Sequence, residues 1–401
     1  MQWADVLATR NTRMKTSEIR ELLKLLDQPD IISFAGGIPD PALFPTDAFS
    51  DAFRNAMQPE NAAVALQYSV SEGYKPLREW LAAQMARIGV PCDADNIFIT
   101  SGSQQALDYL GKLLLSPADT ALVTWPTYLG ALGAFNAYEP RYARLDPYSN
   151  IDPATMQAEA QAAGGAVKFA YLSADFANPT GETLPLAGRE AVLDQAEAMN
   201  IAVIEDGAYQ NLRFEGDPVP PILALDIARN GSIENTRTIY CGSFSKTLAP
   251  GLRVGWVCAA KPVIGRLVLM KQAADLHSPT LSQMATNSVA RAIFDEHVAK
   301  IRAVYDGRRK RMLAALEREM PEGVTFTRPE GGMFIWITLP EDVDGADLLA
   351  RAVAEQRVAF VPGGAFYADG SNRNTARVSY SCASDQQIDE GIARIGRLLR
   401  G

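Results

Sequence analysis

The stretch IAVIEDGAYQ, residues 201–210, sets the class of fold. Its first five residues form a short apolar run rich in β-branched side chains, which is typical of a buried strand. The turn-forming residues that begin at Asp206 end this strand. A helical pattern at 187–199 precedes the run, and a second apolar run, VKFAYL at 167–172, precedes that helix. This strand–helix–strand order predicts a parallel sheet covered by helices.

The same alternation continues in both directions and then changes. Further apolar runs lie at 97–100, 121–124, 238–242 and 254–258, and helical stretches at 104–115 and near 128–136. A long charged helical stretch at about 281–319 is followed by strands at 324–327, 333–339, 358–361 and 376–381, with helices at 346–355 and 385–399. We therefore expect an α/β fold of two domains. The large domain, over 46–285, is a mainly parallel α/β/α domain, and the smaller α+β domain combines 1–45 with 286–401. An amphipathic helix is expected at 16–27.

Composition places the chain among soluble globular proteins. Of 401 residues, 47% are hydrophobic and 21% charged, which is enough for a large core without disulfides. A net charge of −9 disfavours nucleic acid and anionic membranes as partners. There is no long apolar run, and the N-terminal MQWADVLATRNTR carries charges where a signal peptide would be apolar. We expect a cytoplasmic protein.

Several chemistries are excluded or disfavoured by what the sequence lacks. Only two histidines occur, His277 and His297, so a multi-histidine metal centre is disfavoured and we expect no metal. The four cysteines show no CxxC spacing and are expected to be reduced, packed residues. Neither GxxxxGK[ST] nor GxGxxG after a strand is present, so the usual nucleotide loops are missing.

The segment GSFSKTLAPGLRVGW, residues 242–256, combines a lysine with phosphate-binding residue types. The amine of Lys246 is able to form a Schiff base with an aldehyde. Ser243, Ser245 and Arg253 are suited to hold a phosphate beside it. A molecule that carries both an aldehyde and a phosphate, as pyridoxal phosphate does, would suit this segment. Taken alone, the segment favours a solvated surface lysine, because lysine is usually found at the surface.

Two further motifs suit the ring of such a cofactor. Asp206 ends a predicted strand, where ligands bind in open α/β sheets, and its carboxylate would pair with a pyridinium nitrogen. Tyr209 follows three residues later and would donate a hydrogen bond to the phenolate oxygen of the cofactor. In FANPTGETL, residues 176–184, Asn178 would donate a second one. Each motif alone also fits a plain turn.

Three more segments add candidates. In ITSGSQQALD, Ser103 and Gln104 stand at a predicted helix N-terminus, which suits a phosphate but also an ordinary cap. In WPTYLG, Tyr128 follows a strand and would stack on a ring or pack in the core. In NTARVSYS, Arg377 opens a strand and would clamp a carboxylate or form a surface ion pair.

In this order and spacing, the motifs resemble those of fold-type I pyridoxal-phosphate enzymes, the class I/II aminotransferase family with an aspartate aminotransferase-like fold. The likeness covers nearly the whole chain and is greatest to the 2-aminoadipate and kynurenine aminotransferase subgroup. It extends to Ile19-Arg20-Glu21-Leu22, to FAGGIPDPALFP at 34–45, to YSVSEGYKPLREWLA at 68–82 and to FVPGGAFY at 360–367.

The resemblance implies pyridoxal 5'-phosphate as cofactor and a role for each residue. Lys246 would be the catalytic lysine, Asp206 would face the ring nitrogen, and Arg377 would bind the substrate carboxylate with Gly37 and Asn178. The phenolate oxygen, the ring face and the phosphate would be held by Asn178, Tyr209, Tyr128, Ser103, Gln104, Ser243, Ser245 and Arg253. A family tyrosine matching Tyr68 reaches the phosphate of the neighbouring subunit, which implies a homodimer with shared active sites.

The implied reaction moves an amino group from an L-amino acid to a 2-oxo acid such as 2-oxoglutarate. Candidate donors are 2-aminoadipate, glutamate, aromatic and branched-chain amino acids. Arg20 has no acidic neighbour at helical spacing, and the matching arginine of the subgroup binds acidic side chains, so we hypothesise that it contacts the distal carboxylate. The alternative for Arg20 is an exposed or distantly paired side chain.

Two alternatives stay open at this point. The same cofactor and fold also serve C–S lyases, decarboxylases and racemases, although Arg377 favours retention of the α-carboxylate. Some transcription regulators carry an aminotransferase-like effector-sensing domain behind a DNA-binding domain. Only about 45 residues precede the large domain here, without a basic helix-turn-helix pattern, which disfavours that alternative.

Overall fold

The larger sheet of the computed structural model has seven strands, in the order β2-β8-β7-β6-β5-β3-β4. The structure describes residues 2–14, 30–148 and 152–400, so the helix predicted at 16–27 lies outside the described residues. The strands are β2 (Ile97–Thr100), β3 (Thr120–Val123), β4 (Arg141–Arg144), β5 (Val167–Leu172), β6 (Ala202–Asp206), β7 (Thr238–Ser243) and β8 (Gly255–Cys258). Strand β8 runs opposite to the other six strands of this sheet, so the predicted mainly parallel sheet is confirmed.

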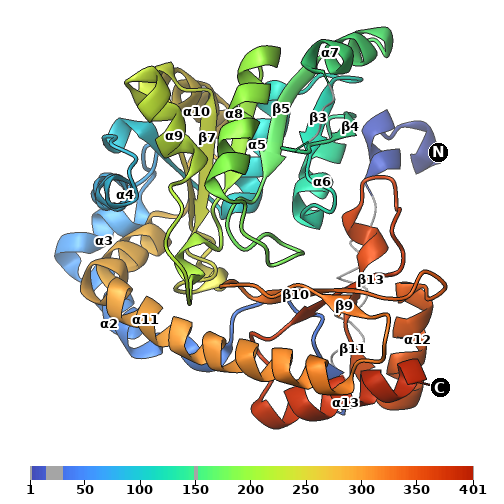
Figure 1. Ribbon diagram of the computed structural model, residues 1–401. Coiled ribbons are helices and arrows are strands. Elements are labelled where there is room, and N and C mark those ends of the chain that lie inside the picture. Colours follow the sequence, from blue (N-terminus) through green and yellow to red (C-terminus); the bar gives the residue numbers. More distant parts are fainter. Residues whose placement is uncertain (1, 15–29, 149–151, 401) are drawn as a thin grey trace.

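Helices cover both faces of this sheet (Figure 1). One face packs against α5 (Ser103–Leu114), α6 (Leu129–Asn136) and α10 (Lys261–Ala274). The other packs against α4 (Lys75–Arg87), α7 (Pro153–Ala162), α8 (Leu186–Met199) and α9 (Ile222–Asn230). Successive residues of β6 serve the two faces: Val203 packs with the α8 side and Ile204 with the α5 side. Burial on both faces explains why these strands are apolar throughout.

A second, antiparallel sheet has the order β12-β13-β10-β9. Its strands are β9 (Thr325–Phe326), β10 (Phe334–Thr338), β12 (Val361–Pro362) and β13 (Thr375–Ser379). It shares a core with α12 (Gly345–Gln356) and α13 (Asp385–Arg400). Beside it, β1 (Ile32–Ser33) pairs in parallel with β11 (Val358–Ala359). This pairing brings the residues after Ser33 close to the smaller sheet.

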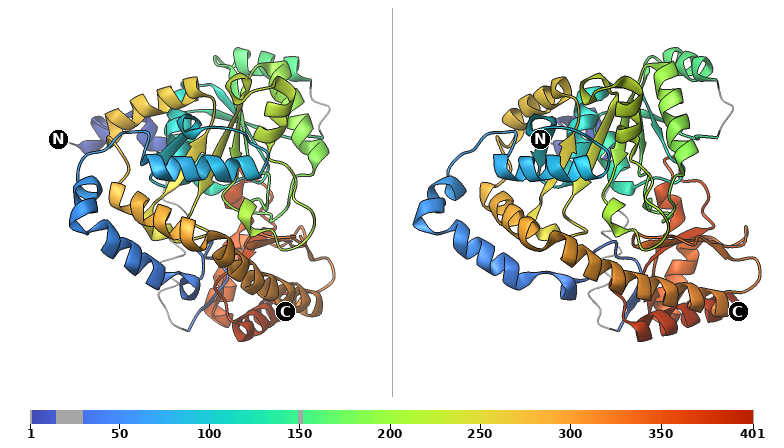
Figure 2. Two further views of the ribbon diagram at one scale, coloured as in Figure 1. Left: turned by 90° about the vertical axis from the view of Figure 1, so that its left-hand side faces the viewer. Right: turned by 60° about the vertical axis from the view of Figure 1, so that its left-hand side comes forward.

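One helix connects the two regions. Helix α11 (Thr280–Glu319) has 40 residues, which corresponds to a length of about 60 Å. It packs on α4, α2 (Thr46–Ala56) and α3 (Pro59–Leu66), and also on α13. Figure 2 shows it running from the side of the larger sheet to the C-terminal helices. The domain limits of 46–285 and of 1–45 with 286–401 stay predictions. Thr9, which was assigned to the smaller domain, donates its hydroxyl to Glu139 of the larger one.

Three expectations from the composition concern the cysteines, a metal centre and a membrane-spanning helix. Cys241 and Cys258 are buried and Cys92 partly so, but Cys382 is exposed, so the prediction that all four are packed is wrong for Cys382. Its place is a turn between β13 and α13, where the neighbours Ser381 and Ala383 fill the core instead. Within the described ranges, no group of metal-ligating side chains is found. In the same ranges, no helix has the length and apolarity needed to cross a membrane.

Candidate active site

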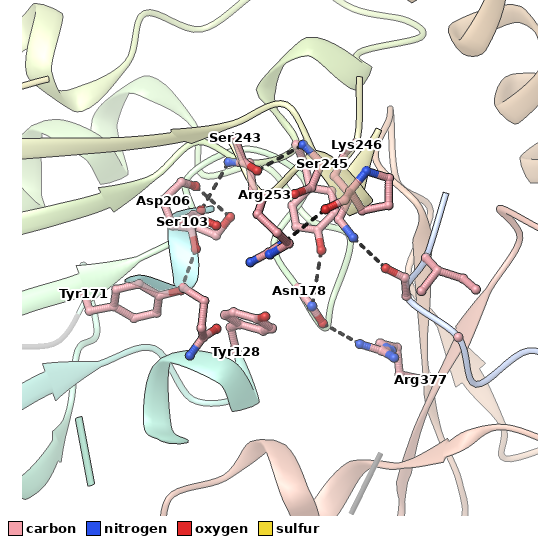
Figure 3. Close-up of a pocket in the computed structure, with 18 residues that line it drawn as sticks. Ser103, Tyr128, Tyr171, Asn178, Asp206, Ser243, Ser245, Lys246, Arg253 and Arg377 are labelled. Atoms are coloured by element: carbon pink, nitrogen blue, oxygen red, sulfur yellow. Dashed lines mark hydrogen bonds between the residues drawn. The ribbon is translucent and has the colours of Figure 1, made fainter. Parts of the chain in front are cut away.

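A pocket of about 260 Å³ lies where the carboxyl ends of β5, β6 and β7 meet the smaller sheet (Figure 3). Because parallel strands end at the same edge of a sheet, residues far apart in sequence converge there. The lining residues are Gly36, Gly37, Ile38, Ser103, Gln104, Tyr128, Tyr171, Ser173, Asn178, Asp206, Ala208, Tyr209, Ser243, Ser245, Lys246, Pro250, Arg253 and Arg377.

This set contains all but two of the residues that the sequence singled out. Tyr68 does not line the pocket; its side chain is 78% exposed in the single chain. Arg20 lies outside the described residues. Tyr171 and Ser173 are in the pocket although no motif in the sequence pointed to them.

Lys246 lies just after β7, and its amine points into the pocket (Figure 3). Its Nζ donates a hydrogen bond to the carbonyl oxygen of Gly37 at 2.7 Å. Burial, together with the positive charges of Arg377 and Arg253, lowers the pKa of Lys246 to about 8. With a pKa of about 8, about a tenth of this amine is unprotonated at pH 7, which supplies the neutral form that a nucleophile or a base requires.

Asp206 is the last residue of β6, and it is held by groups on both carboxylate oxygens. Tyr171 donates its hydroxyl to Oδ2 at 2.9 Å, and the Ala208 N–H donates to Oδ1 at 3.2 Å. Burial raises the pKa of Asp206 above its ordinary value. Tyr171 was not predicted because it stands inside the apolar run of β5, where an aromatic side chain is typical of the core.

Arg377 reaches the pocket from β13 of the smaller sheet and is only 1% exposed. Its Nη1 donates to Oδ1 of Asn178 at 2.8 Å and its Nη2 to the Ala35 carbonyl at 2.8 Å. The guanidinium also lies over the rings of Phe334 and Phe366, 4.4 and 5.1 Å from their centroids. Its Nε is buried and has no hydrogen-bond partner within the described part of the chain.

Asn178 connects Arg377 to the floor of the pocket. While its Oδ1 accepts from Arg377, its Nδ2 lies 3.4 Å from the hydroxyl of Tyr209. Burial raises the pKa of Tyr209 above its ordinary value, so the hydroxyl keeps its proton. A planar ligand with an oxygen substituent would thus meet two donors, one from Asn178 and one from Tyr209.

The opposite end of the pocket is formed by the start of α5 and the loop after β7. Ser103 is the first residue of α5, and Gly102 before it has φ +80°. Nη2 of Arg253 donates to the Ser101 carbonyl at 3.2 Å. A Cβ on Gly102 would lie 2.3 Å from that Nη2, so glycine is required where the guanidinium closes over the helix start. Free N–H groups and an arginine together make an anion site.

The remaining side chains at this end have local partners. The Ser243 hydroxyl accepts the Ser245 N–H at 3.0 Å, which holds the loop that carries Lys246. Gln104 donates its amide to the Gly130 carbonyl at 2.6 Å, beside Tyr128 at the start of α6.

These groups fit pyridoxal phosphate. The pocket offers an amine of lowered pKa for an aldehyde, a buried carboxylate for a ring nitrogen and an anion site for a phosphate, all in one cavity. Fold and site thus define a vitamin B6-dependent enzyme of the aspartate aminotransferase-like fold.

Comparison with known proteins makes the assignment specific. Residues 42–395 match the family described as aminotransferase class I and II. The chain is 42% identical over 393 residues to aromatic-amino-acid aminotransferase 1 of Thermococcus litoralis, covering 96% of this chain and 92% of that protein.

Two solved structures are also similar over 100% of this chain and 98% of their own. One is the alpha-aminoadipate aminotransferase of Thermus thermophilus, complexed with N-(5'-phosphopyridoxyl)-L-leucine, with a TM-score of 0.88 and 38% identity. The other is the kynurenine aminotransferase of Pyrococcus horikoshii in complex with PMP, with a TM-score of 0.90 and 40% identity. The chain belongs to the class I and II aminotransferase family, and it is an aminotransferase that uses pyridoxal phosphate.

The pKa of Lys246 gives a testable pH dependence. Only the neutral amine attacks an aldehyde, so uptake of pyridoxal phosphate by the cofactor-free protein should become faster with rising pH, with a midpoint at about 8. Replacing Arg377 by leucine removes a neighbouring positive charge and should move this midpoint upward. Stopped-flow absorbance over a pH series measures both, and Lys246→Ala is the blank. A wild-type midpoint near the ordinary lysine value of about 10.4 would contradict the assignment.

Proposed function

We propose that this aminotransferase moves the amino group of an L-amino acid to a 2-oxo acid such as 2-oxoglutarate, with 2-aminoadipate, glutamate, aromatic and branched-chain amino acids as candidate donors. The observation that carries the proposal is the pairing of Lys246 with Arg377 in one pocket. The first is a base of lowered pKa, and the second is a buried cation whose Nε–H has no partner in the described part of the chain. An α-amino acid presents an amine and a carboxylate on one carbon, which suits this pair.

In this proposal each residue keeps the role inferred from its motif. Asp206 faces the ring nitrogen, Asn178 and Tyr209 donate to the phenolate oxygen, and Tyr128 stacks on the ring. The phosphate is held by Ser103, Gln104, Ser243, Ser245 and Arg253. The positions of these side chains around one cavity support the assignment.

When bound, pyridoxal phosphate supplies an aldehyde that takes up the amino group and a ring that withdraws electrons. Lys246 would remove the proton from the substrate α-carbon as a base and then, as an acid, give it to the carbon that the aldehyde supplied. Arg377 fixes the α-carboxylate through a charge-assisted hydrogen bond, and Gly37 and Asn178 border the same position. Retention of the carboxylate on Arg377 favours transamination over decarboxylation.

The pocket lining suggests how the donor side chain is selected. Within the described ranges, the cations that line the pocket are Lys246, Arg253 and Arg377, which already have roles. Ile38 at the pocket wall is 50% exposed, so an apolar side chain would find an apolar contact there. A distal carboxylate needs another cation, and we propose Arg20 for it. The crystallised leucine adduct of the Thermus relative and the activity named for the Thermococcus relative are consistent with a mixed donor range.

We further propose a homodimer with shared active sites. Val64, Leu66, Tyr68 and Val70 are apolar or aromatic side chains that are all exposed in the single chain. Such a row is more typical of an interface than of a solvated surface. In the dimer, Tyr68 would reach the phosphate in the partner subunit. The smaller domain, 1–45 with 286–401, would close over the substrate, and α11 would connect it to the large domain of 46–285.

The reaction is tested by a two-substrate assay. Each candidate amino donor other than glutamate is incubated with 2-oxoglutarate and the protein, and formation of glutamate is followed together with loss of the donor. We expect exchange with at least one aromatic, branched-chain or acidic donor, and none with Lys246→Ala. Loss of donor without formation of glutamate, or with release of CO₂ or sulfide, would instead identify a decarboxylase or a C–S lyase.

Arg20→Ala should separate acidic from apolar donors. If Arg20 binds a distal carboxylate, removal of this charge-assisted contact should lower kcat/KM for glutamate or 2-aminoadipate by about tenfold or more. The value for leucine or phenylalanine, determined in half-reactions without a 2-oxo acid, should stay within about twofold of wild type. Equal values for acidic donors in variant and wild type would show that Arg20 has no part in substrate binding.

Tyr68→Phe tests the shared site. Light scattering should give twice the chain mass for wild type and variant, because the substitution removes only a hydroxyl. Loss of a hydrogen bond to a charged phosphate should weaken pyridoxal phosphate binding by about tenfold. A monomer in solution, or unchanged cofactor affinity in the variant, would contradict the proposed role of Tyr68.

A further inference from the structure

A buried lysine lies beneath the phosphate end of the pocket. Lys271, in the last turn of α10, is 0% exposed, although lysine is seldom fully buried. Its Nζ donates to Oε1 of Gln105 at 2.6 Å, to Oδ2 of Asp275 at 2.9 Å and to Oγ of Ser278 at 2.9 Å. These bonds use all three protons of the ammonium group.

The partners of Lys271 hold Ser101, which lies between β2 and the start of α5. Oε1 of Gln105, which receives the lysine proton, also accepts the backbone N–H of Ser101 at 2.9 Å. The hydroxyl of Ser101 lies 3.2 Å from that of Ser278. The carbonyl of Ser101 accepts from Arg253. Ser101 is therefore fixed on two sides by groups that Lys271 orients, and on the third by the arginine proposed to bind the phosphate.

A simple ion pair does not explain this arrangement. Asp275 is 38% exposed and stands four residues after Lys271, so the two could pair at the surface of the helix. The ammonium lies inside instead, where desolvation lowers its pKa and disfavours its charge. What it gains there is contact with Gln105 of α5 and Ser278 of the α10–α11 connection, two segments that do not belong to its own helix.

We propose that Lys271 is a positioning residue for the phosphate group of the cofactor. It connects α5, α10 and the segment before α11, and so fixes Ser101 and the helix start at Ser103 in the geometry that an anion requires. Lys271 is not among the described residues that line the pocket, so it acts through its partners and not by contact with the cofactor. The inference rests on the proposed placement of the phosphate between Ser103 and Arg253.

The test compares two ligands that differ only in the phosphate. Equilibrium dialysis of the cofactor-free full chain gives the Kd of pyridoxal 5'-phosphate and of pyridoxal. For Lys271→Met, which keeps the side-chain length but cannot donate, we expect about tenfold weaker binding of pyridoxal phosphate. Pyridoxal should bind as it does to wild type, because Lys246 and Asp206 are unchanged.

Lys261→Met is the matched control. Lys261 is at the other end of α10 and forms an ion pair with Asp93 at 2.8 Å, with 47% of its side chain exposed. Since an exposed pair of this kind contributes little, both Kd values should equal those of wild type.

Gln105→Met provides a second variant in case Lys271→Met does not fold. It removes the acceptor that connects Lys271 to the Ser101 N–H and leaves the lysine with Asp275 and Ser278. We expect the same selective loss for pyridoxal phosphate. If the foldable variants bind both ligands as wild type does, or lose both equally, the role of Lys271 is overturned. If wild type itself binds pyridoxal as tightly as pyridoxal phosphate, the proposed phosphate site fails instead.

Discussion

The site depends on two cations that share one pocket of low dielectric. Arg377 keeps its charge because Asn178, the Ala35 carbonyl and two aromatic rings replace the water it has lost. Lys246 donates to one carbonyl, that of Gly37, and so it is the group that gives up its proton. In the same cavity, Arg377 thus stays positively charged, whereas Lys246 is able to gain and lose a proton. Burial contributes most to the lowered pKa of Lys246 in the loop after β7, and the charge of Arg377 on the smaller sheet lowers it further.

Because Arg377 lies on the smaller sheet and Lys246 follows a strand of the larger one, the chemistry of the pocket depends on how the two sheets are positioned. Arg377 reaches Asn178 in the loop after β5, and its other Nη bonds Ala35, which follows β1. A Cβ on Gly37 would lie 3.1 Å from the ring of Phe334, so the backbone of that loop fits closely against β10. A displacement of the smaller sheet would therefore change the carboxylate site and the environment of the Lys246 amine together. In the proposed reaction, substrate binding and proton transfer would be linked through the same guanidinium.

Site residues could be predicted from the sequence where backbone pattern and chemistry agree. Asp206, Asn178 and Lys246 follow apolar runs, and because β5, β6 and β7 are parallel, their ends had to meet. Prediction failed where the sequence pattern around a residue or strand did not indicate its role or its presence. Tyr171 donates a hydrogen bond to Asp206, but a tyrosine inside an apolar strand is typical of the core, so its role was not predicted. Strand β4 was not predicted because its sequence, Arg-Tyr-Ala-Arg at the sheet edge, contains no apolar run. The Lys271 cluster could not be predicted either, since its partners come from three segments that only the fold brings together.

The phosphate end shows how a polar cluster connects parts of the chain beyond the pocket. Ser278, which accepts from Lys271, precedes α11, and its carbonyl lies 2.9 Å from Nδ1 of His277. The His277 ring in turn meets Tyr68 edge-on, with centroids 6.1 Å apart. In the proposed dimer, Tyr68 would serve the partner's phosphate, while Lys271 would position Ser101 of its own chain. The short segment between α10 and α11 thus contacts both Lys271, through Ser278, and the ring of Tyr68, through His277.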